Sequence, residues 1–536
     1  MPLASVSKSE WRWSGLWALV IMLITSLPYM YGLAASTPQQ RFSGFILGVE
    51  DGNSYLAKMR MGGEGGWLSY LAYTPEPHPG AFVFTFHVLL GKIAGLLDLP
   101  AILVYHLARV IFGVGLLLTV YYFIAYFVEE VARRRFAFLL AALGGGLGWL
   151  IILMGLTPEL GLPLDIYVPE GFIFLVLLNL PHLAVAESLL FLSIILVLQS
   201  WAEARWQPAL SAGLTLLAMS AITPFYIAIH VAVLGSAWLV IFVVERSIRQ
   251  SWNRLNKILL AVVVASPLLL YDAYLFTTDP IFKVFAAQNL ILSPPIWHYL
   301  FAYGLLIIPA LYGVLSFGPA TQIVRNDRFL TLIIWCLIFP ILVYIPFNLQ
   351  RRLAVGVQVP LAVLATYGLF ELGQKYITAR RRRLAGAAAL ILFSLTNLFL
   401  LAGGLLAIRV RQPPVFQPGL QIEAMAWLAD KTKGGEVVLA THATGNVLPV
   451  YASVRTFVGH GPETVYADQK LAQVDAFFGT AVNDTWRLDL LKHFEIDYVF
   501  FGPNEKAVGD FDPNLVPYLD EIYQNGAVTI FQVTSP

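Results

Sequence analysis

The sequence predicts a polytopic α-helical membrane protein of about 11 spans with a small extracytoplasmic α/β domain at its C-terminus. Hydrophobic residues make up 58% of the chain and charged residues only 12%. The apolar residues fall into repeated runs that are long enough to cross a bilayer as helices. After about Val410 this pattern stops and the composition becomes that of a soluble domain. We therefore expect a transmembrane domain over residues 1–409 and an α/β domain over residues 410–536.

Each apolar run is taken as one span. The expected spans are residues 14–34, 101–128, 136–156, 183–200, 208–224, 225–244, 257–276, 299–318, 329–346, 356–373 and 384–408. The small residues at 34–36 resemble a signal-peptide cleavage site, but the many later spans favour a retained signal anchor. Between the first two spans lies a long polar segment, the first outer loop, over residues 35–100.

The distribution of basic residues predicts the orientation, because cytoplasmic loops are enriched in Lys and Arg. With the N-terminus inside, the strong clusters all fall on the cytoplasmic side. They are Arg133, Arg134, Arg135, Arg205, Arg246, Arg249, Arg254, Lys257, Arg325, Arg328, Lys375 and Arg380 to Arg383. This agreement requires that residues 81–97 and 172–180 are re-entrant or interfacial helices rather than spans. The C-terminal domain then lies outside the cytoplasm.

The C-terminal segment begins with a stiff linker, Arg411-Gln412-Pro413-Pro414, because consecutive prolines favour an extended backbone. Hydrophobic periodicity then predicts an α/β fold. The expected elements are helices over 422–431, 465–478 and 484–493 and strands over 436–440, 498–501 and 528–533.

Composition and motifs exclude several classes of protein. The net charge of +1 is balanced rather than concentrated, which argues against a nucleic-acid partner. Cys336 is the only cysteine, so the chain has no internal disulfide or cysteine metal site. The sequence has no Walker loop, no HExxH pair and no nucleophile elbow, which disfavours an ATPase, a metalloprotease and a lipase.

Glu50 and Asp51 are the strongest candidates for chemistry, because these adjacent carboxylates follow an aliphatic approach to the membrane surface. A carboxylate in this position is suited to general-base catalysis. Alternatively, Asp51 is the N-cap of the following helix and accepts an orphan amide of residue 53 or 54. That helix is expected to lie in the membrane interface, with Tyr55, Leu56 and Met59 on one face and Lys58 pointing elsewhere.

His78 lies among alternating prolines in the segment Thr74-Pro75-Glu76-Pro77-His78-Pro79-Gly80, which fixes an extended backbone. A rigidly held imidazole can orient a phosphate, bind a metal or help proton transfer. The alternative is that His78 packs the loop.

Arg351 and Arg352 are exceptions to the charge distribution, because they fall on the predicted outer side. A guanidinium pair at the membrane edge suits a phosphate head group. The alternative is that these side chains reach toward lipid phosphates at a helix end.

Other ionisable residues are candidates for lining a cavity. His106 and Arg109 are close to one helical turn apart within a predicted span. Arg109 alternatively neutralises a partner such as Glu187. The remaining candidates are His182, beside a predicted outer loop, and His460 and Glu463, in the outer-domain segment Gly459-His460-Gly461-Pro462-Glu463-Thr464. That segment is alternatively a turn whose Thr464 caps the next helix.

The order of these features resembles the GT-C superfamily of polyprenyl-phosphate-dependent glycosyltransferases, which includes protein O-mannosyltransferases and lipid A aminoarabinose transferases. The matching features are a first span, an outer loop with an acidic pair, a membrane-surface helix, the proline-flanked His78, many spans and an outer C-terminal domain. The resemblance covers most of the chain as architecture. Only the first-loop motif matches at the level of residues.

The resemblance implies an inverting transfer of a sugar from a polyprenyl-phosphate donor to a hydroxyl of a glycan, lipid or protein acceptor. The reaction would take place at the outer face of the cell membrane. Asp51 would be the general base, and Glu50 would support it or bind a divalent cation such as Mg or Mn. Arg351, Arg352 and His78 would bind the donor phosphate. The sugar, the acceptor and the metal requirement are left open.

Two other classes of function compete with this one. A transporter or flippase for a lipid-linked substrate would use His106, Arg109 and Glu187 as a pathway, but the sequence lacks the internal repeat of broken helices typical of transporters. The second is a non-catalytic envelope assembly protein, which would use the C-terminal domain to engage a partner. This class is favoured if Asp51 serves only as a helix cap.

Overall fold

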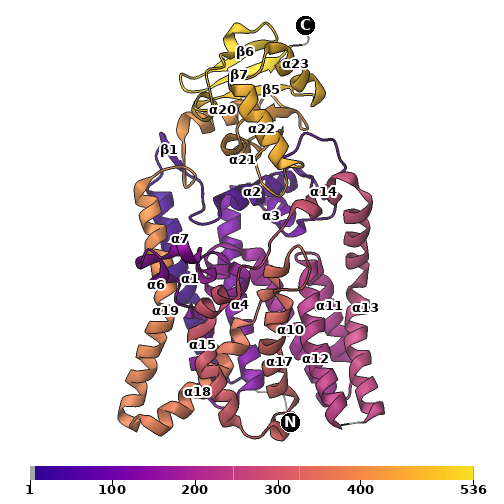
Figure 1. Cartoon of the computed structure of the whole chain (residues 1–536), viewed down its shortest axis with the longest axis vertical. Coiled ribbons are helices and arrows are strands. Elements are labelled where there is room, and N and C mark those ends of the chain that lie inside the picture. The colour runs from indigo at the N-terminus through magenta and orange to yellow at the C-terminus, as the bar shows by residue number, and fades with distance from the viewer. Residues whose placement is uncertain (1–5, 246, 325, 535–536) are drawn as a thin grey trace. The chain divides into compact units, whose positions relative to one another are not determined.

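The computed structural model describes residues 6–245, 247–324 and 326–534, so Arg246 and Arg325 of the topology prediction lie outside the described residues. The chain forms two compact units. The first unit comprises Met1–Ser26, Leu107–Ala273 and Leu290–Gly403. The second comprises Leu27–His106, Tyr274–Asn289 and Gly404–Pro536. Figure 1 shows their elements along the chain.

Among the described residues, nine helical segments are long and apolar enough to cross a membrane. They are Lys8–Ala34 (α1), Ala101–Phe127 (α4), Val131–Leu153 (α5 and α6), Pro181–Glu203 (α10), Pro224–Val244 (η2 and most of α12), Ile248–Thr278 (α13), Ile296–Phe317 (α15), Gln350–Tyr376 (η3 and α18) and Ala379–Val410 (α19). Each coincides with an expected span. The structure therefore confirms a polytopic helical membrane protein.

The other two expected spans are helical but shorter. The helix α11, Gln207–Ser220, has 14 residues, and α17, Asp327–Leu342, has 16. The helix α11 stops because Pro224 begins the short 3₁₀ helix η2, Pro224–Tyr226. In α17 the last turn contains Pro340, after which the chain turns. The apolar sequence continues past both helix ends, so the spans predicted from it, residues 208–224 and 329–346, extend beyond the helices.

The two segments expected to be re-entrant are too short to span a bilayer by themselves. The helix α3, Thr85–Leu97, has 13 residues, and α9, Ile173–Asn179, has seven. A straight crossing needs about 20 residues at 1.5 Å each.

Within the first unit, α15 packs against α18 at very short distance. A Cβ atom on Gly368 would lie 1.9 Å from the carbonyl oxygen of Pro309, and one on Gly313 would lie 2.2 Å from that of Leu364. Only glycine permits this approach of two backbones, as is common between membrane helices. The remaining short elements of this unit are α7 (Thr157–Leu160), α8 (Leu164–Tyr167), η1 (Pro169–Gly171), α16 (Ala320–Val324) and η3 (Gln350–Ala354).

Within the second unit, the first outer loop folds into two packed helices, α2 (Val49–Gly63) and α3. Glycine again sets the distance, because a Cβ on Gly91 would lie 1.8 Å from the carbonyl oxygen of Met59. The loop also carries the strand β1, Gln40–Phe42, which pairs antiparallel with β2, Phe416–Pro418. The helix α14, Pro280–Gln288, also belongs to this unit.

The C-terminal part of the second unit is built on a five-stranded mixed sheet of order β4-β3-β5-β7-β6. Its strands are β3 (Val437–Leu439), β4 (Arg455–Thr456), β5 (Tyr498–Phe501), β6 (Leu519–Gln524) and β7 (Thr529–Val533). Its helices are α20 (Gly419–Ala429), α21 (His442–Tyr451), α22 (Ala467–Phe478), α23 (Asp484–His493) and α24 (Pro503–Lys506), with the 3₁₀ helix η4 (Pro513–Leu515).

Two apolar clusters form the core of this α/β part. Val499 and Phe501 of β5 join the cluster that includes α22 and α23, whereas Phe500 joins the cluster that includes α20 and α21. This alternation is the period of two expected for a strand with helices on both faces. Figure 1 shows the sheet and its helices near the C-terminus of the chain.

Candidate functional site

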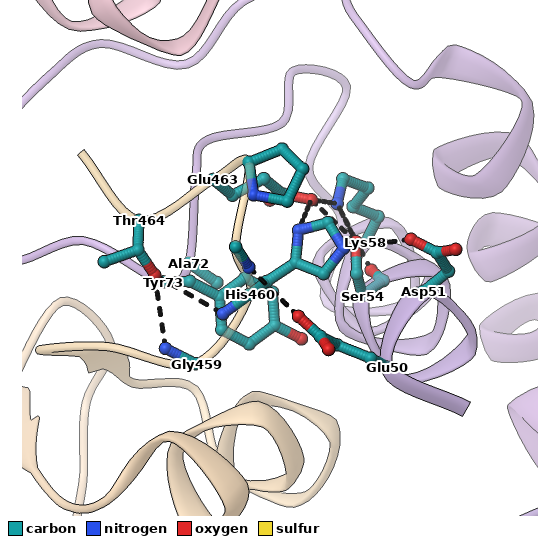
Figure 2. Close-up of polar contacts among 12 residues, drawn as sticks. Glu50, Asp51, Ser54, Lys58, Ala72, Tyr73, Gly459, His460, Glu463 and Thr464 are labelled. Atoms are coloured by element: carbon teal, nitrogen blue, oxygen red, sulfur yellow. Dashed lines mark hydrogen bonds and ion pairs between the residues drawn. The ribbon is translucent and has the colours of Figure 1, made fainter. Parts of the chain in front are cut away.

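The helix α2 begins at Val49, directly after Gly48, so Asp51 is not its N-cap. Gly48 is the N-cap with φ 60° and ψ 44°, a left-handed conformation that glycine adopts without strain, and no side chain caps this helix end. Glu50 and Asp51 therefore lie in the first helical turn. The interpretation of Asp51 as an N-cap is wrong. Its carboxylate is directed instead toward the segment 459–464, here called the histidine loop (Figure 2).

Glu50 is held by the histidine loop and by α21. Its Oε1 accepts a hydrogen bond of 3.0 Å from the amide of Gly461 and lies 3.4 Å from Nε2 of His442. Partial burial raises the pKa of Glu50, but the interactions with His442 and Gly461 outweigh burial and place it below its ordinary value. Glu50 is therefore a carboxylate with a fixed position at neutral pH.

Asp51 and His460 form the centre of the site. His460 is buried, and its Nε2 lies 3.0 Å from Oδ1 of Asp51, whose side chain is 59% exposed. On the other side of the ring, Nδ1 lies 3.3 Å from Oε1 of Glu463. Burial lowers the pKa of His460, but the two carboxylates outweigh burial and raise it above its ordinary value. Both ring nitrogens thus face carboxylates, which favours the doubly protonated ring.

Lys58 completes the cluster. Its Nζ lies 2.6 Å from both Oε1 of Glu463 and Oγ of Ser54, and Ser54 donates to the same Glu463 oxygen at 2.7 Å. Lys58 is 1% exposed and Glu463 is 2% exposed. Burial raises the pKa of Glu463, but Lys58 and His460 outweigh it and keep the carboxyl ionised. The cluster therefore combines the carboxylates of Asp51 and Glu463 with the ammonium of Lys58 and with the imidazole of His460, whose pKa is raised.

This burial corrects only the expectation for Lys58, which was predicted to point away from the apolar face of α2; the predicted location of α2 in the membrane interface stays a prediction. Most of α2 is buried, because it packs against α3 and α21. A buried ammonium is tolerated here because Glu463 and Ser54 bind it.

The histidine loop is held in one shape by its own hydroxyl. Oγ1 of Thr464 accepts hydrogen bonds from the amides of Gly459 at 3.2 Å and His460 at 3.4 Å (Figure 2). The alternative in which Thr464 caps the next helix is wrong, since α22 starts after Tyr466, which has φ 56°. Gln288 of α14 also donates to the carbonyl oxygens of Pro462 and Thr464, at 2.9 and 2.6 Å.

The helix α21 is fitted closely against this loop and against α2. A Cβ on Gly445 would lie 2.0 Å from the carbonyl oxygen of Val458, so only glycine fits there. Asn446 accepts a 2.7 Å hydrogen bond from Asn53 and donates at 3.2 Å to the Glu50 carbonyl oxygen. Tyr73 donates to the Asn446 carbonyl oxygen, and its ring centroid lies 5.6 Å from that of His460.

The raised pKa of His460 makes a pH-dependent contribution to stability. A histidine with a raised folded pKa stabilises the protein fully below its unfolded pKa of about 6.5, and the contribution is lost as the pH rises through the folded pKa. We expect His460→Gln to lower stability by about 1–3 kcal/mol at low pH. The difference from wild type should shrink as the pH rises.

The measurement is the midpoint of thermal unfolding between about pH 5.5 and about pH 9, which brackets the ordinary histidine pKa of about 6.5. The control is His493→Gln, because His493 is exposed at the end of α23. A constant difference between His460→Gln and wild type over this range would contradict the proposed charge of His460.

His78 and His106 of the second unit both bond to backbone. In His78, Nε2 accepts from the Leu71 amide at 2.9 Å, and Nδ1 lies 2.7 Å from the Glu76 carbonyl oxygen. Burial lowers the pKa of His78. Since both ring nitrogens are engaged, this geometry favours loop packing over phosphate binding. His106 has Nε2 2.9 Å from the Gly44 carbonyl oxygen, which also indicates a structural role.

Arg351 and Arg352 lie in η3 of the first unit. The guanidinium of Arg351 lies 5.1 Å from the ring centroid of Tyr167, and Nε of Arg352 lies 3.2 Å from Oε1 of Glu170. Among the described residues, Nε of Arg351 is buried without a hydrogen-bond partner. Such a donor is costly unless a ligand or water satisfies it.

The other candidates of the first unit have different surroundings. Arg109 is buried and donates to Ser26 at 2.7 Å, to the Leu177 carbonyl oxygen at 3.0 Å and to Thr25 at 3.2 Å. Arg109 was alternatively expected to neutralise Glu187. Among the described residues, neither carboxylate oxygen of Glu187 has a hydrogen-bond partner, so Arg109 does not donate a hydrogen bond to it. His182 lies in the first turn of α10.

The carboxylates at the site do not form a cation site by themselves. In the described part of the chain, no group of three or more His, Cys, Asp or Glu side chains is arranged to hold a metal ion. Glu50 and Asp51 already accept from donors, namely the Gly461 amide, His442 and His460. The described residues present therefore do not fit a dedicated Mg or Mn site.

Sequence reasoning identified Glu50, Asp51, His460 and Glu463 but did not place them together. It missed Ser54 and Lys58, which lie three and seven residues after Asp51 and so share its helix face. It also missed His442, since no expected element contained it. The helical spacing of Asp51, Ser54 and Lys58 was a signal for a polar face.

No protein-family model matches the sequence, and no curated protein matches it. Solved structures do match. The archaeal oligosaccharyltransferase AglB from Archaeoglobus fulgidus, in complex with an inhibitory peptide and a dolichol-phosphate, is 15% identical with a TM-score of 0.50. The match covers 91% of this chain and 69% of that one.

Two further structures match over nearly the whole chain. ArnT from Cupriavidus metallidurans, bound to undecaprenyl phosphate, is 12% identical with a TM-score of 0.51, covering 96% of this chain and 98% of that one. The arabinofuranosyltransferase AftD from Mycobacteria is 16% identical with a TM-score of 0.57, covering 99% of this chain but only 42% of that one. These proteins share the GT-C fold, so the chain has that fold and the resemblance in architecture is confirmed.

Proposed function

We propose that this chain, which has the fold of the GT-C glycosyltransferases, transfers a sugar from a polyprenyl-phosphate donor to an acceptor hydroxyl, with Asp51 as the general base. The observation that carries the proposal is the state of the Asp51 carboxylate. It is largely exposed, yet it is anchored by the buried His460. A general base must be able to reach its substrate, and an exposed carboxylate that a buried side chain holds in position meets this requirement.

The chemistry follows from this placement. The acceptor hydroxyl donates a hydrogen bond to Asp51, its oxygen attacks the anomeric carbon, and its proton passes to the carboxylate as the bond to the lipid phosphate breaks. A positioned base contributes about 10²- to 10⁴-fold to the rate of such a step. Attack opposite the leaving phosphate inverts the anomeric centre, which is the stereochemical outcome that we propose.

The residues behind Asp51 act as positioning residues. His460 fixes the Asp51 carboxylate, Glu463 fixes His460, and Lys58 compensates the charge of Glu463. Asp51 is exposed, whereas the three residues behind it are buried, so the base is held by side chains that are themselves fixed by packing. Glu50 is the neighbouring carboxylate and supports the same helix turn through the Gly461 amide.

Arg351 and Arg352 are proposed to bind the donor phosphate, and the support is the buried, unsatisfied Nε of Arg351 among the described residues. Developing charge on a leaving phosphate is stabilised by guanidinium donors. AglB and ArnT were solved with dolichol-phosphate and undecaprenyl phosphate, respectively, which supports a polyprenyl-phosphate as the ligand class. His78 is a weaker candidate for this role, because its ring nitrogens are engaged.

We expect Arg351→Ala to raise the KM for the donor about 10-fold or more while changing the KM for the acceptor much less. The reason is the loss of a charged hydrogen bond, worth about 1.5–3 kcal/mol. Steady-state kinetics with each substrate varied in turn measure this difference. Arg205→Ala is the control, because the Arg205 side chain is 63% exposed. Equal loss for both substrates would indicate a structural role for Arg351.

The proposed location is the cell membrane, with the N-terminus cytoplasmic and the α/β domain over residues 410–536 outside. This orientation supports transfer at the outer face, where both the first outer loop and the α/β domain would lie. The proposal rests on the side preference of Lys and Arg in the loops.

The experiment that tests the function uses purified protein in lipid with a panel of radiolabelled polyprenyl-phosphate sugars and candidate acceptors. Turnover of at least one donor, with inversion at the anomeric carbon, supports the proposal and names the donor. Movement of labelled lipid to the opposite leaflet of proteoliposomes without turnover of any donor would overturn it in favour of a flippase.

A further inference from the structure

A cavity of about 630 Å³ lies in the second unit between α22 and α23. Sites for small ligands typically measure roughly 300–1,000 Å³. The cavity is separate in its residues from the Asp51 cluster. Its lining includes Tyr466, Gln469 and Gln473 beside or on α22, and Trp486, Asp489 and His493 on α23. We refer to it as the α22/α23 cavity.

The spacing of the lining residues shows that each helix turns one polar face to the cavity. On α23 the lining positions are 486, 489, 490 and 493, and on α22 and its N-cap they are 466, 469, 470 and 473. Both series repeat at i, i+3, i+4 and i+7, which is one helix face. A face that only packed against its neighbour would be apolar. These faces carry two amides, a carboxylate and an imidazole, together with aromatic rings.

The lining of the cavity includes an ion pair between Lys470 and Glu76. Lys470 is 2% exposed, and its Nζ lies 2.6 Å from Oε2 of Glu76 and 3.0 Å from Oγ1 of Thr74. The Lys470 ammonium also lies 5.7 Å from the ring centroids of Phe457 and Phe494. Burial lowers the pKa of Lys470 to about 8, against the opposing effect of Glu76.

The charges of the lining residues indicate the chemical class of the ligand. Glu76 compensates Lys470, and Asp489 adds a negative charge, so the lining has no excess of positive charge that would suit a phosphate. Side-chain amides and carboxylates can bind the donors and acceptors of neighbouring hydroxyl groups. Trp486 and Tyr466 add flat apolar faces with polar edges. A ligand with many hydroxyl groups and apolar C–H faces matches all of these features.

We propose that the α22/α23 cavity binds a neutral oligosaccharide. That this oligosaccharide is part of the acceptor glycan rests on the proposed function, whereas the binding of a saccharide in the cavity does not. The link to the reaction is the loop that carries the lining residue Glu76. In this loop Thr74 follows Tyr73, whose ring centroid lies 5.6 Å from that of His460, and Thr74 accepts a 3.3 Å hydrogen bond from the amide of Val465. The cavity would hold acceptor sugars remote from the reacting hydroxyl.

The test is binding of neutral disaccharides to the purified full-length protein, measured by saturation-transfer NMR and calorimetry. The probes are mannobiose, galactobiose, arabinobiose, glucobiose and chitobiose. We expect saturable binding of at least one probe, weakened at least 10-fold by Asp489→Asn, Gln473→Ala and Trp486→Ala. Asp489 is exposed, so its variant tests the site even if Trp486→Ala unfolds the helix. Trp427→Phe is the control, because Trp427 packs against Tyr523 in the other apolar cluster.

The outcomes separate this proposal from the proposed function. Asp51→Asn should bind the disaccharide as wild type does, even though it is expected not to transfer sugar. Binding without any transferase activity in wild type would overturn the transferase and retain the saccharide site. Absence of binding for every probe would overturn the saccharide site. Unchanged affinity in both Asp489→Asn and Gln473→Ala, or tighter binding of the corresponding sugar phosphate, would also overturn it.

Discussion

Asp51→Asn is expected to lower the rate of sugar transfer by about 10²- to 10⁴-fold while leaving the protein folded and inserted. An amide cannot accept the proton of the acceptor hydroxyl, so the contribution of the general base is lost. The fold should survive, because Asp51 does not cap α2 and its side chain is largely exposed. The amide oxygen can still accept the hydrogen bond from His460. Single-turnover assays with the identified donor measure the loss.

The matched control is Asp430→Asn, which makes the same chemical change at an exposed residue at the end of α20. It should transfer at the wild-type rate. Glu50→Gln separates the two neighbouring carboxylates and should cost less than Asp51→Asn, because Glu50 is already occupied by the Gly461 amide and His442. Unchanged turnover in Asp51→Asn would refute the assignment of the base.

The membrane helices were predictable because they depend on continuous apolar runs, which are local in sequence. The strand over residues 498–501 and the helix over residues 484–493 were also predicted with the bounds that the structure has. Helix α21 escaped prediction, since Gly445 and Pro449 are poor helix formers. Tertiary packing overrides that preference, because Gly445 is required beside Val458. Strand β6 was missed, as Asp520 and Glu521 interrupt its apolar pattern at the sheet edge.

The candidate site was predictable only as separate pieces. The sequence marks an acidic pair in the first loop and a histidine with a glutamate near the C-terminus, and each motif alone fits a cap or a turn. What makes them a site is a contact between Asp51 and His460, 409 residues apart. Periodicity carries no information over such a separation. The same reason explains Lys58, which was expected to point away from the face that carries Tyr55, Leu56 and Met59, because its partner Glu463 lies 405 residues later in the chain.

The pair of Lys58 and Glu463 gives the largest expected effect on stability. Lys58→Met leaves the Glu463 carboxylate buried without the Lys58 ammonium, and Glu463→Gln leaves that ammonium buried without a negative charge beside it. Removing one partner of a buried pair costs about 3–5 kcal/mol. We expect hydrogen exchange of the histidine loop to accelerate about 10²- to 10⁴-fold in either variant, since about 1.4 kcal/mol is a factor of ten. Glu64→Gln on the same helix is the control, because its pair with Arg60 is exposed, and it should cost at most about 1 kcal/mol.

The double variant Lys58→Met with Glu463→Gln distinguishes a charge effect from a packing effect. It removes both charges of the pair together, and the introduced glutamine side chain retains an acceptor for the Ser54 hydroxyl. If the cost of the single variants is that of an unpaired buried charge, the double variant recovers more than half of it, and the coupling energy is of order 2 kcal/mol or more. Additive losses would show that the two residues stabilise α2 independently. Recovery of stability with transfer still impaired would then indicate that the pair serves to hold His460, and through it the base, in position.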